Sequence, residues 1–150
     1  MSEPIIKKIK EYMKSCPYLN DLSKINVDYL NVGDNDFEYW SIEQVEAPII
    51  LKRNVLGTKT ERQCVFVIAS RSFFNPLTDT QQIENLHLFE KIAEWYHMNT
   101  KNKILPELND RETSTGIEVM DCGFLYGINE KSTLARYQMR CRLLYEKKEE

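Results

Sequence analysis

The segment from Thr133 to Glu146 decides the fold, and it reads TLARYQMRCRLLYE. Apolar and polar residues alternate along it, which is the two-residue period of a β-strand with one buried face. The positions predicted to face the core are Ala135, Tyr137, Met139, Cys141, Leu143 and Tyr145. The opposite face is predicted to carry Arg136, Gln138, Arg140 and Arg142. A long strand covered on one side only is therefore expected at the C-terminal end of the chain.

Other strands are predicted around it. Residues 116–126 are strand-like, and a turn over Gly127–Lys131 would join them to the last strand as a hairpin. Residues 63–70 contain the continuous apolar run Cys64–Ala69, which is typical of a strand in the middle of a sheet. These segments predict a sheet whose centre is formed by distant parts of the chain.

The N-terminal third predicts a second hairpin. Residues 25–29 alternate apolar with polar, residues 31–36 have the composition of a turn, and residues 37–45 resume a strand. The segment Pro48–Lys52 is predicted to be an edge strand or an arm, because proline lacks the N–H that a central ladder position requires.

Two helices are expected. Between Pro4 and Ser15 the apolar residues recur at helical spacing, and Pro17 ends the pattern. Between Asp79 and Thr100 the period is again 3.6 residues, and Thr78 or Asp79 could cap the start. The predicted apolar stripe of this longer helix contains Ile83, Leu86, Phe89, Ile92, Ala93 and Tyr96.

The resulting order is α-β-β-β-α-β-β, in one domain covering residues 1–150. A chain of 150 residues with 42% hydrophobic and 29% charged residues has the composition of a single soluble domain. Because the strands cluster at both ends instead of alternating strictly with helices, we expect an α+β fold. Its sheet should be mainly antiparallel, with both helices on one face.

Composition narrows the function. The formal charge of −3 argues against tight binding of nucleic acid by phosphate neutralisation. The first residues lack the pattern of a signal peptide and no apolar run has the length of a membrane span, so an intracellular protein without a membrane partner is expected. The four cysteines, Cys16, Cys64, Cys122 and Cys141, form no close pair and are expected to be reduced and mostly buried.

An enzyme is not expected, and no cofactor or metal is implied. The chain lacks a Gly-rich phosphate loop and a Gly-x-Ser-x-Gly motif. Its two histidines, His87 and His97, share a helical stripe with Glu90 and Glu94, which could begin a carboxylate metal site. That stripe lies opposite the apolar face, so a solvated surface is the favoured interpretation. Cysteine-histidine catalysis stays formally open, although packing in strands explains Cys64 and Cys141.

Three features could serve interaction. Arg136, Arg140 and Arg142 form a basic row where carboxylates or a loose phosphate backbone could dock, and a solvated strand face is the plainer alternative. Leu88 and Trp95 lie at the margin of the long helix and could face a partner, or could pack beneath a neighbouring loop. Tyr39 and Trp40 point to opposite faces of one strand, which favours oligomerisation because a singly covered sheet buries only one of the two rings.

Together these segments resemble the tail terminator, or minor capsid, proteins of tailed phages, prophages and phage-tail-like particles of Clostridium-type bacteria. The resemblance extends over most of the chain, and the segments that carry it are Cys16–Leu19, Lys24–Leu30, Tyr39–Glu43, Phe66–Arg71, Leu105–Leu108 and Ala135–Tyr145. They are scaffold segments without a reactive signature.

The resemblance implies a structural virion protein, assembled in the bacterial cytoplasm, whose copies close into a ring, expected to be a hexamer, at the head-proximal end of the tail tube. The tail tube and the neck would be its partners, with genome DNA passing only transiently through the lumen. We expect Pro48, Leu51 and Lys52 of the arm, and the last hairpin, to supply subunit contacts, and the three arginines to line the lumen or bridge subunits. The alternative is a monomeric head-completion or adaptor protein that binds through Leu88 and Trp95.

Overall fold

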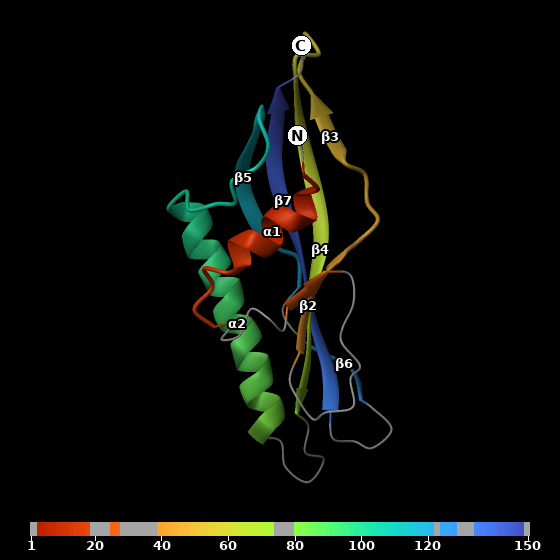
Figure 1. The fold of residues 1–150 in the computed structure, drawn as a ribbon, viewed down its shortest axis with the longest axis vertical. Coiled ribbons are helices and arrows are strands. Elements are labelled where there is room, and N and C mark those ends of the chain that lie inside the picture. Colours follow the sequence, from red (N-terminus) through yellow and green to blue (C-terminus); the bar gives the residue numbers. More distant parts are fainter. Residues whose placement is uncertain are drawn as a thin grey trace.

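The computed structural model describes residues 3–18, 25–27, 39–73, 80–121, 124–128 and 134–148. Figure 1 shows a tall, twisted sheet with both helices packed against it. The elements in chain order are α1 (Ile5–Met13), β1 (Ile25–Val27), β2 (Tyr39–Gln44), β3 (Ile50–Arg53), β4 (Lys59–Phe73), α2 (Thr80–Lys101), β5 (Glu112–Val119), β6 (Phe124–Ile128) and β7 (Leu134–Lys148).

Strands β4 and β7 form the spine of the sheet. They pair antiparallel over their whole length, from Lys59 opposite Lys148 to Phe73 opposite Leu134. The strand order is β1-β2-β4-β7-β5, while β3 pairs with β4 and β6 with β7. The central position predicted for residues 63–70 is confirmed. The strand is longer than predicted because its apolar run marks only the buried middle, and the more polar residues on either side continue the ladder.

The α+β class, the mainly antiparallel sheet, the two helices and the predicted order of elements are confirmed. Two details are added by the structure. The arm after Pro48 is a paired strand, β3. The strand predicted over residues 116–126 is divided into β5 and β6, which pair with successive parts of β7.

The predicted N-terminal hairpin is wrong, because β1 runs parallel to β2, with Ile25 opposite Trp40 and Val27 opposite Ile42. Alternation indicates which face of a strand is buried, but it does not distinguish parallel from antiparallel pairing. The predicted turn at residues 31–36 lies outside the described residues, as do the proposed caps Thr78 and Asp79.

The core lies between one face of the sheet and both helices. All six predicted inward positions of β7 are at most 4% exposed, which confirms the alternation of the last strand. From β4, Phe66 and Ile68 join this layer, and α1 adds Ile6, Ile9 and Met13. Phe66 meets the ring of Tyr96 edge-on, at 6.5 Å between centroids. The expectation that both helices cover a single face is therefore correct.

The buried line of α2 is narrower than the predicted stripe. Phe89, Ile92 and Tyr96 are fully buried, and Asn85 and Asn99 extend the line at each end. Ile83, by contrast, is 59% exposed, so its assignment to the core is wrong. Ile83 precedes Ile92 by about two and a half turns at 3.6 residues per turn, which places it on the opposite side of the helix. Neither described helix is long and apolar enough to cross a bilayer.

Candidate functional site

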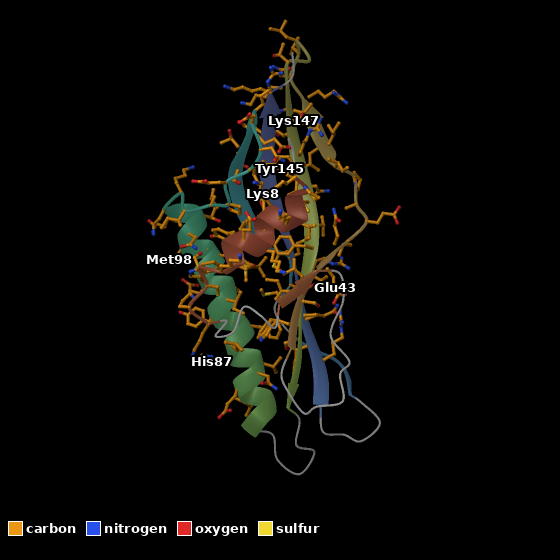
Figure 2. The ribbon with its side chains drawn as sticks, viewed as in Figure 1. Lys8, Glu43, His87, Met98, Tyr145 and Lys147 are labelled. Atoms are coloured by element: carbon orange, nitrogen blue, oxygen red, sulfur yellow. The ribbon has the colours of Figure 1, made fainter. Side chains whose placement is uncertain are left out.

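The outer face of the sheet, turned away from α1 and α2, carries ion pairs that span strands. On β7, Arg136 binds Glu43 of β2, with Nη2 at 3.0 Å from each carboxylate oxygen. Ser41 also donates to Glu43. Burial alone would raise the pKa of Glu43, but the hydrogen bonds from Arg136 and Ser41 outweigh it, and the pKa is lowered. Figure 2 shows Glu43 on β2. Its bond with Arg136 ties β2 to β7 across the intervening β4.

A second polar chain crosses the upper part of this face. The Gln63 amide nitrogen donates to the carbonyl of Pro48, and its oxygen accepts from Arg142. Arg142 in turn binds Glu118 on β5, with Nε at 2.7 Å from the carboxylate. These hydrogen bonds therefore link the arm before β3 to β5 at the far edge of the sheet. The charge of Arg142 is thus paired inside the subunit.

Arg140 differs from the other two arginines of the row. It is exposed, and no acceptor for its guanidinium lies within the described part of the chain. Its cross-strand partner on β4 is Val67, whose side chain cannot accept a hydrogen bond. The structure thus places all three predicted arginines on one face, and among the described residues Arg140 is the one of the three whose guanidinium is not paired.

The β3 side of the sheet is open. Leu51 is 45% exposed and lies at an irregularity of the ladder between Ile50 and Lys52, while Pro48 and Lys52 are also exposed. Beside this edge, a hollow of about 480 Å³ opens between the start of α1 and the connection before β3, next to Ile5, Val45 and Ile49. The arm predicted from Pro48 to Lys52 therefore lies at an edge with its apolar side chains in solvent.

The β5 side is built differently, because α2 is fastened to it. Thr100 of α2 uses one hydroxyl for both backbone groups of Ile117, accepting from N at 3.1 Å and lying 3.3 Å from O. Gly116 permits this approach, since a Cβ there would lie 3.1 Å from the methyl carbon of Thr100. Backbone groups that an edge strand would otherwise offer to another chain are thus satisfied internally.

A groove of about 560 Å³ runs along this fastened edge, between α2 and β5. Its apolar lining comes from Ala93, Ile117 and Val119, and its acidic lining from Glu90, Glu94 and Glu118. Glu90 and Glu94 are exposed, whereas Glu118 is already paired with Arg142. The groove therefore has an apolar lining, and the carboxylates of Glu90 and Glu94 beside that lining are exposed to solvent.

The three predicted partner-facing residues are not alike. Trp40 is buried, with its ring 5.5 Å from that of Phe89, so its assignment to a partner surface is wrong. It belongs to the inner face of β2, where the helices cover it. Leu88 and Trp95 are half-buried and pack against the core, and Trp95 also lies 5.1 Å from the ring of Tyr12. Their margins alone are available to a partner.

The polar stripe of α2 is exposed, as expected from its position opposite the buried line. His87 points away from the sheet (Figure 2), and its Nδ1 lies 3.6 Å from Glu90. Within the described ranges, no three histidine, cysteine, aspartate or glutamate side chains are grouped to hold a metal ion. Cys16, Cys64 and Cys141 are buried thiols, as predicted, and Cys122 lies outside the described residues.

Sequence reasoning missed the tip of the β3–β4 hairpin and the α2–β5 groove. Val55 and Leu56, at the tip, are 103% and 83% exposed. Two apolar residues inside a turn that contains Asn54 and Gly57 were a readable signal, since turns favour polar residues. The groove had no comparable signal, because it forms only when α2 and β5 meet.

No protein-family model matches this chain, and no curated protein matches it.

Proposed function

We propose that this chain is a structural protein of phage-type tails, a terminator whose copies close into a ring, proposed as a hexamer, on the head-proximal end of the tail tube. The observation that supports it best is the pair of unlike edges, β3 with its exposed hairpin and β5 with its helix-lined groove, on opposite sides of one sheet (Figure 1). Unlike patches on one subunit make heterologous contacts, and these form rings when the rotation closes.

The resemblance to tail terminator proteins is consistent with this architecture. The segments that carry it include Tyr39–Glu43 in β2, Phe66–Arg71 in β4 and most of β7. These strands build the spine and the paired outer face, so the likeness falls on the scaffold that would repeat around a ring. In the proposed role the protein works without catalysis or a cofactor: the ring stops growth of the tube and presents a surface to the neck.

The outer face suits a wall past which a genome moves. Arg136 and Arg142 are paired with Glu43 and Glu118, so these two arginines add little net charge to a surface where tight phosphate binding would impede transit. Arg140 is the residue that separates two versions of the proposal. Facing the lumen it would meet DNA only transiently, and facing a neighbour it would bind that subunit's carboxylate.

Reversing the charge at Arg140 distinguishes these two versions of the proposal. Arg140→Glu should leave ring assembly intact if the residue faces the lumen, whereas loss of the ring would assign it to the subunit contact. Arg142→Glu is the matched comparison, because it also breaks the internal pair with Glu118 and should lower the stability of the isolated subunit. Assembly is measured by imaging, and stability by chemical denaturation.

The proposed function is tested by assembling tail tube protein with and without this chain. We expect shorter tubes and a closed ring at one tube end when the chain is present. Tubes of unchanged length, together with a single copy bound at a head-tail connector, would favour the alternative of a monomeric adaptor that uses the margins of Leu88 and Trp95.

A further inference from the structure

The β3–β4 hairpin ends in an ordered turn with an apolar tip. The Asn54 side-chain oxygen accepts from the backbone of Thr58 and Lys59, and Gly57 donates back to the carbonyl of Asn54. Gly57 has φ of +70°, a conformation that glycine adopts without strain. The turn is therefore built to hold one shape while Val55 and Leu56 project into solvent.

Single exposed apolar side chains are common and need no explanation. Here, however, Val55 and Leu56 are consecutive, and Leu51 and Ile49 on the same arm are 45% and 57% exposed. On the β3 side of this patch Lys52 and Arg53 are exposed, and Lys52 lies opposite the exposed Glu61 of β4. An apolar tip with a cationic flank calls for a partner with apolar surface beside carboxylates.

The α2–β5 groove of the same chain has that chemistry. It places the half-buried Ala93 and Val119 beside Glu90 and Glu94, over the buried Ile117, and its volume of about 560 Å³ leaves room for both tip side chains. The hydrogen bonds between the Thr100 hydroxyl and the Ile117 backbone hold α2 on β5, so the groove has its shape before a partner binds. Strands β3 and β5, which carry the hairpin and one wall of the groove, lie at opposite edges of the sheet (Figure 1), so a subunit does not fill its own groove.

We infer that the β3–β4 tip of one copy docks into the α2–β5 groove of a second copy. Val55 and Leu56 cover the apolar lining, and the Lys52 flank faces Glu94. Each copy then offers one tip and one groove, which is a heterologous contact that repeats from subunit to subunit. The inference names the contact that the proposed function needs, and it rests on that function only for the place of the ring on a tail.

The hollow beside β3 is a weaker receiver for the tip. It adjoins the arm itself, so filling it would require two copies to meet edge to edge in a symmetric dimer, and Glu46 is the acidic residue that lines it. Docking in the α2–β5 groove and symmetric pairing through the hollow predict different behaviour when tip and groove variants are mixed.

The test measures self-association of the purified full chain by sedimentation velocity up to millimolar concentration. We expect the wild type to associate, and Leu56→Asp in the tip or Ala93→Arg in the groove to weaken association by about tenfold or more. Mixing the two variants should give heterodimers that grow no further, since that mixture retains one working tip and one working groove. Ile83→Asp, at a 59% exposed site that lines neither patch, should behave like the wild type.

A charge exchange provides a second test with mild, exposed substitutions. Lys52→Glu and Glu94→Lys should each weaken association severalfold, and the two together in one chain should restore it. Circular dichroism checks that every variant folds.

A wild type that stays monomeric, a mixture of tip and groove variants without heterodimers, an equal loss with Ile83→Asp or an absence of rescue overturns the inference. Failure here leaves the proposed function standing if a ring is still imaged on tail tubes. Conversely, tip-to-groove docking without any ring on a tail removes the function and keeps the contact.

Discussion

The β5 edge of the sheet is covered by a helix, whereas the β3 edge is exposed. At the β5 edge, α2 covers the strand, Thr100 occupies the backbone groups of Ile117, and Ile117 is 4% exposed. At the β3 edge, a short strand continues into a bare hairpin, and Leu51 is 45% exposed. One edge contributes to the stability of the subunit, whereas the other has apolar surface left to bury elsewhere. Substitutions at the two edges should therefore affect different measurements.

The largest contrast is expected from truncating one aliphatic side chain at each edge. Ile117→Ala should lower the free energy of unfolding by about 2–5 kcal/mol, because it leaves a cavity between β5 and the helices. Leu51→Ala should cost less than about 1 kcal/mol, since its side chain is already partly in water. Urea denaturation of the two variants measures both values. Equal losses would show that the β3 edge is as much a part of the core as the β5 edge.

A smaller effect is expected from opening the β5 edge without creating a cavity. Thr100→Val keeps the shape of the side chain but removes the hydroxyl that serves both backbone groups of Ile117, and it should cost about 1 kcal/mol. Hydrogen exchange of the Ile117 amide should accelerate while amides of β4 keep their protection. Unchanged exchange at Ile117 would mean that Thr100 does not close this edge. Thr100→Ser, which retains the hydroxyl, is the matched control.

The smallest effect is expected from the Arg136 and Glu43 pair on the outer face. Arg136→Gln should lower stability at pH 7 by roughly 0.5–1 kcal/mol. Because the folded-state pKa of Glu43 is lowered below the ordinary value of a glutamate, 4.5, the contribution of the pair is present at neutral pH and is lost as the pH falls through the folded pKa. The wild type and Arg136→Gln should therefore converge in denaturant titrations only once the pH has fallen below the lowered folded-state pKa of Glu43.

Glu43→Gln is the control for this pH dependence. It removes the titrating carboxyl group, so its free energy of unfolding should lack the loss in acid that the wild type owes to Glu43. A difference between wild type and Arg136→Gln that stays constant from pH 7 into the acid range would contradict the assignment of the effect to Glu43.

The sequence predicts what depends on strong local periodicity. The alternation of β7 identified every buried position of that strand from Ala135 to Tyr145, because the two kinds of side chain differ sharply along it. It also predicted the row of arginines on the outer face. The direction of β1 was not predictable from the same pattern, since alternation is identical in parallel and antiparallel strands.

The candidate site was predictable only in part. Leu51 and Lys52 were identified at an open edge because Pro48 cannot occupy a central ladder position. The partners of Arg136 and Arg142 lie far away in the chain, on β2 and β5, so no local pattern announced that these charges are used within the subunit. The α2–β5 groove depends on Thr100 meeting Gly116, a contact between residues of separate elements. Tertiary pairing therefore supplied what periodicity could not.

The most direct test of the proposed ring is a reconstruction of a native tail with this chain in place. We expect a closed ring of copies at the head-proximal end of the tube, with neighbouring copies joined edge to edge through unlike surfaces. A single copy at the connector, or copies absent from that end of the tail, would contradict it.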